Sequence, residues 1–187
     1  MIKQEQLLIN ILEEVTRRFN ILLEENKRLL EEVSFKATHD ILTNLYNRDF
    51  FEKMVNKLIL EKKEFCLIFM DLDNFKYVND THGHKTGDMI LIRVAKIIKY
   101  FLKGKDLVAR FGGDEFVIAI VDCRKKEALR IMEQIRNEIK GTLKKYNITS
   151  SIGIACFPQD GDNYETLVKL ADKKMYKAKE KKDMIAV

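Results

Sequence analysis

The sequence predicts an α/β (α+β) fold, with a mixed central sheet and a β-hairpin, flanked by helices and preceded by one long N-terminal helix. Two observations carry this prediction. Stretches with helical periodicity alternate with short apolar runs of strand length. The pair Gly112-Gly113, which readily adopts the positive φ of a tight turn, joins two such runs as a hairpin. A hairpin inside the alternation favours a sheet of mixed direction over a doubly wound parallel sheet.

The N-terminal helix is predicted over residues 1–36, ahead of a globular domain over residues 37–187. Its apolar side chains alternate at spacings of four and three, which is the pattern of a coiled-coil seam. The seam positions are Leu8, Val15, Leu22 and Leu29 in one set, and Leu12, Phe19, Asn26 and Val33 in the other. With the second set at the a positions, Asn26 would pair with its symmetry mate and specify a parallel dimer. Further apolar residues widen the stripe, so a helix packed on its own domain is the alternative.

Each later element has its own signal. Residues 49–60 have an amphipathic helical pattern, and the six apolar residues 65–70 match a buried strand. Residues 88–102 gather apolar side chains on one helical face, and strands 107–111 and 115–121 flank the glycine pair. Helix 124–146, strand 148–157 and helix 164–182 complete the order.

Composition limits the partners and the location. The net charge of +5 is modest, and lysines near the C-terminus supply much of it. Such a stretch is usually a solvated helix face, although it also attracts polyphosphates. There is no basic stripe interleaved with aromatic residues, so no nucleic-acid binding is expected. Neither a membrane span of roughly 20 apolar residues nor a signal peptide is present. A complete chain of this kind is expected in the cytoplasm, and a piece of a larger sensor would have the same features.

Cysteines and histidines are expected to be structural. Cys66, Cys123 and Cys156 lie far apart, in or beside apolar stretches, and form no C-x-x-C motif. We expect reduced, mostly buried thiols. His82 and His84 have no third ligand at metal spacing.

Two pairs of carboxylates follow predicted strands or turns. Asp71 and Asp73 come directly after the apolar run 65–70, and Asp114 and Glu115 come directly after the glycine pair. Buried carboxylates are costly without compensation, and a hard cation such as Mg²⁺ would supply it. Adjacent strands would bring both pairs together as a Mg²⁺ site that binds phosphates. The alternative is that each acid caps a helix or a turn, and Asp73, ahead of a short helix, suits capping.

Residues Asn74-Phe75-Lys76 open that short helix. Free backbone N–H groups and a lysine at a helix start form a cradle for phosphate. Lys85-Thr86 is not a P-loop, because the glycine spacing is absent. These residues alone indicate a Mg²⁺-dependent nucleotide enzyme.

Five motifs resemble one family. The segment 110–116 reads RFGGDEF, the signature of GGDEF domains, and it is joined by matching segments at 40–48, 71–80, 83–88 and 171–179. The chain therefore resembles GGDEF-domain diguanylate cyclases over about residues 40–179. The resemblance implies a GGDEF fold related to nucleotide-cyclase and polymerase palm domains. It also implies condensation of two GTP molecules into cyclic di-GMP, with release of two pyrophosphates.

The resemblance also implies residue roles. Two Mg²⁺ ions, with Mn²⁺ as an alternative, would be held by Asp71, the Leu72 carbonyl, Asp114 and Glu115. Either Asp114 or Glu115 would help to deprotonate the attacking 3′-hydroxyl. The triphosphate would be bound by Asn74, Phe75, Lys76 and Lys179. The guanine edge would be read by Asn79 and Asp88.

The implied reaction needs two active sites, because each protomer would hold one GTP, and the N-terminal helix would supply the homodimer. One alternative is a catalytically silent module that binds GTP or cyclic di-GMP and signals through its helix. Another is a dimerisation scaffold, which would need no guanine reader.

Three departures from the family pattern stand out. Asn44 replaces a glycine, and Asn tolerates the left-handed region. The residues Lys182-Asp183-Met184 stand where the family has Gly-Arg-Asn, so a phosphate-binding Arg is missing. The inhibitory R-x-x-D site reads Lys103 to Asp106, and lysine lacks the planar fork of arginine. Weak product binding is therefore expected there.

Overall fold

The computed structural model describes residues 2–187, and the side chains of Ile2, Lys3 and Leu8 lie outside that description. The Leu8 position of the predicted seam is therefore not among the described side chains. The chain divides into two compact units, Met1–Ala37 and Thr38–Val187, which are described one at a time. Within the described range, no helix is both long enough and apolar enough to cross a membrane.

The first unit is formed by α1 (Ile2–Thr38), an unbroken helix of 37 residues. Ion pairs one turn apart line its surface, including Glu14 with Arg17 and Arg18. More than half of the surface of each of these seam side chains is exposed: Leu12, Val15, Phe19, Leu22, Leu29 and Val33. A long helix with an exposed apolar seam has the character of a coiled-coil strand.

The second unit contains the remaining elements. Its helices are α2 (Arg48–Leu60), α3 (Phe75–His82), α4 (His84–Phe101), α5 (Lys125–Thr142), the 3₁₀ turn η1 (Lys144–Tyr146) and α6 (Tyr164–Lys181). Its strands are β1 (Phe65–Asp73), β2 (Leu107–Gly112), β3 (Glu115–Val121), β4 (Thr149–Phe157) and β5 (Ile185–Ala186). Asn47 and Asn163 cap α2 and α6, each accepting a hydrogen bond from a backbone N–H of the first turn.

The strands form one mixed sheet in the order β2-β3-β1-β4-β5. Strand β1 lies between β3 and β4 and is antiparallel to both, whereas β4 and β5 are parallel. Strands β2 and β3 form the hairpin predicted from the glycine pair. The expected mixed sheet with a hairpin is confirmed.

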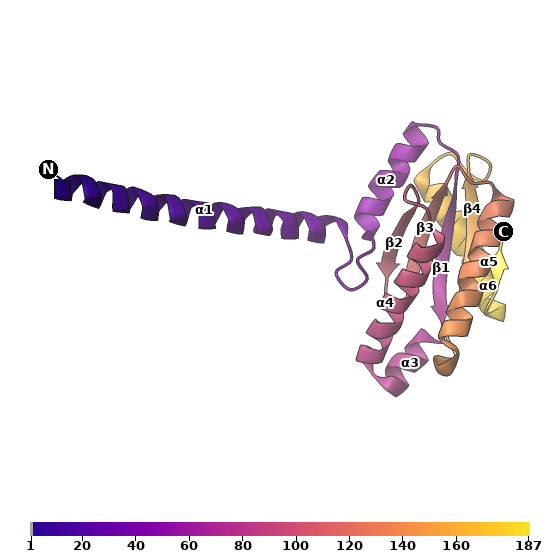
Figure 1. Cartoon of the computed structure of the whole chain (residues 1–187). Coiled ribbons are helices and arrows are strands. Elements are labelled where there is room, and N and C mark those ends of the chain that lie inside the picture. The colour runs from indigo at the N-terminus through magenta and orange to yellow at the C-terminus, as the bar shows by residue number, and fades with distance from the viewer. Residues whose placement is uncertain (1) are drawn as a thin grey trace. The chain divides into compact units, whose positions relative to one another are not determined.

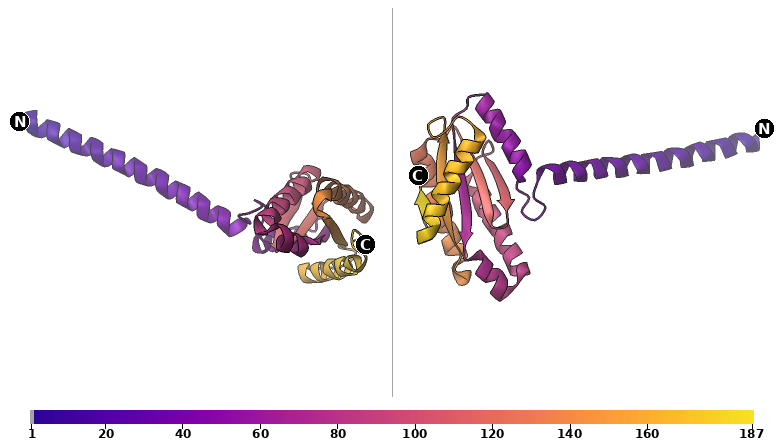
Figure 2. Two further views of the ribbon diagram at one scale, coloured as in Figure 1. Left: turned by 90° about the horizontal axis from the view of Figure 1, so that it is seen from below. Right: turned by 180° about the vertical axis from the view of Figure 1, so that it is seen from behind.

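Helices cover both faces of the sheet. One face packs its apolar side chains against α3, α4 and α5, and Figure 1 shows α4 and α5 side by side across it. The other packs against α2 and α6, which lie in front of the sheet in the right-hand view of Figure 2. Because side chains alternate along β1, Phe65, Leu67 and Phe69 face α2 and α6, and Asp71 and Asp73 continue that face.

Several element boundaries differ from the predicted ones, and β1 continues to Asp73, three residues beyond its predicted end, so that Asp71 and Asp73 lie within the strand. Helix α4 begins at His84 rather than at residue 88, directly after Gly83, whose φ of 79° ends α3. Helix α5 ends at Thr142, and the last predicted turn is the 3₁₀ segment η1. Strand β5 was not predicted, because two residues are too short for a periodic signal.

The expectation of reduced thiols is wrong for two of the cysteines. Cys66 on β1 and Cys156 on β4 are paired in register and form a disulfide. Their separation of 90 residues concealed this pairing in the sequence. Cys123 is a buried free thiol, as expected.

The packing of α6 on β4 predicts that Gly153→Ala is strongly destabilising. A Cβ at Gly153 would lie well inside van der Waals contact of the Ala171 carbonyl oxygen and the Met175 amide nitrogen. Backbone atoms cannot yield unless α6 moves away, so we expect a loss of about 3 kcal/mol or more in the free energy of unfolding. Urea denaturation measures it.

The control is Gly141→Ala, in α5, where the added Cβ meets open space. Alanine favours the helix, so this variant should be more stable than the parent by up to about 1 kcal/mol. A Gly153→Ala protein as stable as Gly141→Ala would contradict the close packing of α6.

Candidate active site

The register between β1 and β3 brings the two carboxylate pairs together. Asp71 lies directly opposite Glu115, the first residue of β3, in the last pair of the β1–β3 ladder. The backbone N–H of Leu72 donates a hydrogen bond of 3.3 Å to the carbonyl of Asp114. Three of the predicted metal-binding acids therefore meet at one end of the sheet.

Asp71 is almost completely buried, with an exposed fraction of 3%. Its Oδ2 accepts a hydrogen bond of 2.8 Å from Lys179 on α6, while its Oδ1 has no partner among the described residues. Burial raises the pKa of Asp71 to about 6, the charges of Asp114 and Asp73 add to the rise, and Lys179 opposes it. The site holds more negative charge than its lysine neutralises.

Glu115 shows the same excess of negative charge. Burial raises the pKa of Glu115, and the nearby charges of Asp114 and Asp172 raise it further. The charge of Asp114 thus repels the ionised forms of both Asp71 and Glu115. A cation would relieve this repulsion.

The donor set fits a hard divalent cation. It consists of carboxylate and backbone oxygens, and one of them is the buried, unpartnered Oδ1 of Asp71. Across the part of the chain that the structure describes, no three acid, histidine or cysteine side chains lie close enough together to hold a metal ion. The residues fit Mg²⁺ in kind and in charge, and their carboxylates are not gathered around a common point.

Asp73 is not a helix cap, and its carboxylate is bound by donors from β4 and from the segment after α6. Its carboxylate accepts hydrogen bonds from the Thr149 and Ser151 hydroxyls of β4, at 2.6 and 2.7 Å, and from the N–H of Asp183, at 3.0 Å. The residue at the cap position of α3 is Asn74. The suggestion that Asp73 caps the helix is wrong, because β4 supplies closer donors that are distant in the sequence.

The predicted phosphate cradle begins with a left-handed residue. Asn74 has a φ of 64°, which Asn tolerates better than most residues. Its side-chain nitrogen donates to the Asn147 carbonyl at 2.9 Å, and its Oδ1 accepts from Lys182 at 2.8 Å. Phe75 is buried and Lys76 is exposed. Lys76 is therefore free to meet an anion at the start of α3.

The two predicted guanine readers lie on α3 and α4, on either side of the corner at Gly83. The amide oxygen of Asn79 packs against Gly87, so tightly that a Cβ there would overlap it. Asp88, the next residue, is exposed. Because Gly87 has no side chain, the amide of Asn79 can pack directly against the first turn of α4, where Asp88 is the next residue.

Arg110 holds the signature turn in place through contacts that the sequence pattern did not predict. Arg110 donates to the Gly113 carbonyl through Nε and Nη2, at 3.0 and 2.8 Å, and its Nη1 lies 3.4 Å from both oxygens of Asp40. Asp40 also accepts from the N–H and the hydroxyl of Thr43. Both residues lie in the matching motifs, but only the tertiary structure pairs them.

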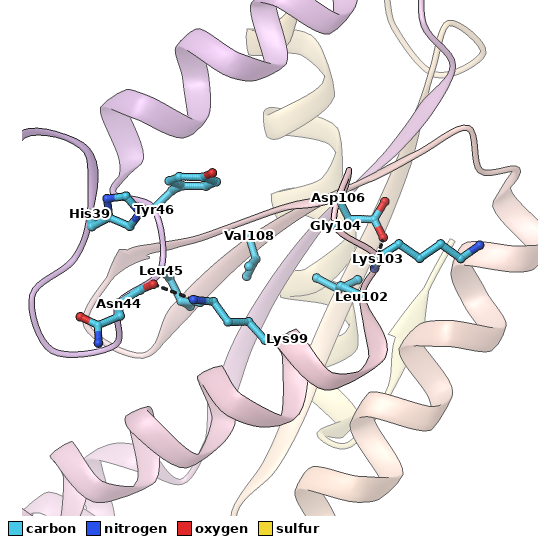
Figure 3. A pocket seen from close by; sticks show the side chains of 10 residues that line it. All are labelled: His39, Asn44, Leu45, Tyr46, Lys99, Leu102, Lys103, Gly104, Asp106 and Val108. Carbon is cyan, nitrogen blue, oxygen red and sulfur yellow. Dashed lines mark hydrogen bonds between the residues drawn. The ribbon is translucent and has the colours of Figure 1, made fainter. Parts of the chain in front are cut away.

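The segment Lys103 to Asp106 is built as a turn. Asp106 accepts from the N–H groups of Lys103 and Val121, at 2.8 and 3.0 Å, so both of its oxygens are engaged. A cavity of about 290 Å³ adjoins it, lined by His39, Asn44, Leu45, Tyr46, Lys99, Leu102, Lys103, Gly104, Asp106 and Val108. Figure 3 shows Lys103 extending away from Lys99, which donates to the Asn44 carbonyl. None of the clustered carboxylates lines this cavity.

Comparison with protein families identifies the second unit. A family model described as "Diguanylate cyclase, GGDEF domain" matches residues 37–184. The chain belongs to the GGDEF family.

Known GGDEF proteins resemble it over most of its length. It is 36% identical over 183 residues to the bifunctional diguanylate cyclase/cyclic di-GMP phosphodiesterase MucR of Pseudomonas aeruginosa, covering 93% of this chain and 27% of that protein. It is 34% identical over 183 residues to diguanylate cyclase A of Treponema denticola, covering 91% of this chain and 48% of that protein. The chain thus spans less than half the length of these two relatives.

A solved GGDEF structure bears out the fold. The crystal structure of the coiled coil and GGDEF domain of DgcB from Caulobacter crescentus, in complex with c-di-GMP, matches with a TM-score of 0.80 at 28% identity. The match covers 94% of this chain and 98% of that one. The long N-terminal helix and the mixed sheet thus recur together in a GGDEF protein.

The charge excess in this GGDEF domain predicts that Asp71→Asn stabilises the metal-free protein at alkaline pH. The pKa of Asp71 is raised from 3.8 to about 6, so the folded state holds this proton more tightly than the unfolded state. Stability is therefore lost as pH rises through that interval, and the whole cost is present above it. Asn resembles the protonated acid, so we expect a gain on the order of 1–3 kcal/mol near pH 8 in EDTA.

Urea denaturation at two pH values tests this expectation. Near pH 4, where Asp71 is protonated in the folded state, parent and variant should be about equally stable. An Asp71→Asn protein less stable than the parent near pH 8 would show that the ion pair with Lys179 outweighs the burial of the charge.

Proposed function

We propose that this chain is a diguanylate cyclase, which condenses two GTP molecules into cyclic di-GMP and releases two pyrophosphates. The observation that carries the proposal is the opposition of Asp71 and Glu115, beside Asp114, at the end of β1 and β3. Membership of the GGDEF family supports the same reaction class. The 3′-oxygen of one GTP attacks the α-phosphorus of the other, and the bond to the β-phosphate oxygen breaks.

We propose that the acids at the sheet end hold two Mg²⁺ ions. Asp71, the Leu72 carbonyl, Asp114 and Glu115 are the proposed ligands, and the unpartnered Oδ1 of Asp71 supports the assignment. When bound, Mg²⁺ would neutralise charge on the triphosphate and acidify the attacking hydroxyl. Mn²⁺ has the same preference for oxygen ligands and could substitute.

The remaining roles fall to the chain's own side chains. Lys76 and Lys179 neutralise the phosphates, and Lys179 already contacts Asp71. Asn79 and Asp88 select guanine, because one carboxylate can accept from both N1–H and the exocyclic amine. Either Asp114 or Glu115, the two acids that follow the glycine pair, takes the proton of the 3′-hydroxyl.

The reaction as proposed needs a homodimer. Each GGDEF domain would bind one GTP, so two active sites must face each other across a two-fold axis. The exposed apolar seam of α1 supports dimerisation through a coiled coil, which would raise the local concentration of one site for the other.

A silent signalling module is the second candidate. It would bind GTP or cyclic di-GMP without turnover, and a pure scaffold would bind neither. The presence of Asp71, Asp114 and Glu115 favours the enzyme, since a module without turnover has no use for a buried aspartate with two further acids beside it.

Incubation of the purified protein with GTP and Mg²⁺ tests the proposal through the appearance of cyclic di-GMP and pyrophosphate. Asp71→Asn should lower the rate at least about hundredfold while the fold stays intact, because a negative metal ligand is lost. Asp162→Asn, at an exposed acid outside the site, is the control. Activity of Asp71→Asn within about threefold of the parent at saturating Mg²⁺ would rule out the metal assignment.

Gly87→Ala should impair guanine selection without unfolding the protein. Alanine favours a helix, the group it would overlap is the end of the Asn79 side chain, and the Phe75 ring, 3.2 Å from the added Cβ, needs to yield only slightly. We expect the preference for GTP over ATP, measured by direct competition, to fall at least about tenfold. Circular dichroism and urea denaturation check the fold. An unchanged preference would exclude Asn79 as a base reader.

Removal of residues 1–34 should lower the activity per protomer most strongly at low protein concentration. Mass action should partly restore activity as the truncated protein is concentrated. Activity assays across a dilution series, paired with analytical ultracentrifugation, measure both effects. A monomeric full-length protein with undiminished specific activity would refute the role of α1.

A further inference from the structure

Lys182 has a backbone conformation that lysine rarely adopts. It follows α6 with φ 53° and ψ 159°, and Asp183 follows with a φ of 50°. Glycine, which the family pattern has at the position of Lys182, tolerates positive φ at little cost, whereas a side chain makes it strained. Strain of this kind persists where the surroundings hold it, and it gathers at functional sites.

Hydrogen bonds and ion pairs from α5 and β1 hold this turn in place. Arg136 on α5 donates to both the carbonyl and the carboxylate of Asp183, at 2.8 and 2.7 Å, and Lys140 donates to the other carboxylate oxygen. The N–H of Asp183 donates to Asp73 on β1. The acid that stands where the family pattern has arginine is therefore paired with α5, and its charge is compensated there.

The turn directs the Lys182 side chain to the start of α3. Its Nζ lies 2.8 Å from the amide oxygen of Asn74, a neutral acceptor. No carboxylate within 4 Å of this ammonium group is found among the described residues. An exposed hydrogen bond to an amide contributes little to stability, so this contact does not by itself account for the strained backbone.

We propose that Lys182 binds the terminal phosphates of the nucleoside triphosphate and so replaces the arginine that the family pattern has one residue later. The inference rests on the proposed function, since it assigns one more residue to the same substrate. Lys179, on the last turn of α6, contacts Asp71 near the end of β1. Lys182 contacts Asn74, three residues further along the chain, and its charge is not already paired with an acid among the described residues.

Calorimetric titration of the full chain with a GTP analogue whose α–β bridge is a methylene, and separately with GMP, tests the proposal. Lys182→Gln keeps a donor for Asn74 but removes the charge. We expect it to weaken binding of the triphosphate analogue at least about tenfold and binding of GMP by less than about twofold. Lys182→Arg should restore binding to within about threefold of the parent.

Lys181→Gln is the matched control, because Lys181 is the exposed neighbouring lysine at the end of α6. It should change both affinities by less than about twofold, the expectation for a charge remote from the phosphates. Equal effects of Lys181→Gln and Lys182→Gln would overturn the inference, since general charge would then explain the loss. A parent that binds no GTP analogue in Mg²⁺ would overturn the proposed function itself.

Thermal unfolding separates binding from a structural role. Lys182→Gly relieves the strained backbone, so its Tm should rise by about 2–6 °C while triphosphate binding weakens as in Lys182→Gln. A purely structural lysine would give the opposite result, a lower Tm together with unchanged discrimination between the triphosphate and GMP. That result would overturn the inference and leave the proposed function standing.

Discussion

The hydrogen-bond ladder between β1 and β3 holds two acids, Asp71 and Glu115, opposite each other at the end of a buried sheet. Burial raises the pKa of both carboxyl groups, and the charge of nearby Asp114 raises each of them further, so the ionised acids are costly without a positive counter-charge. The domain therefore carries a built-in demand for positive charge. Lys179 meets part of it, and the proposed metal ions would meet the rest.

Helix α6 supplies the positive charge of Lys179 to these acids. It can deliver Lys179 to Asp71 only because Gly153 allows its backbone to approach β4 closely. The segment after α6 is tied back to β1 by Asp73 and to α5 by Arg136. Packing and charge are thus coupled through one helix and the turn that follows it.

The hairpin turn at Gly113 and the Asn79 side chain at the α3–α4 corner are positioned in different ways. At the hairpin, Arg110 bridges the Gly113 carbonyl and Asp40, so the signature turn is attached to the segment that follows α1. At the corner, Gly87 leaves room for Asn79. The turn is held by hydrogen bonds from a side chain, whereas Asn79 is accommodated because Gly87 has no side chain.

The sequence by itself determined the order of elements, the hairpin and the motifs of the GGDEF family, because periodicity, turn residues and motifs are local signals. It also indicated that the acids after residue 70 and after Gly113 belong together. Only the tertiary structure decided which partners each side chain has. Asp73 binds β4 instead of capping α3, and Cys66 pairs with Cys156 across 90 residues. The strained Lys182 turn likewise depends on Arg136, far away in the chain. These outcomes depend on strand register and close helix packing, which arise from long-range contacts that no local pattern encodes.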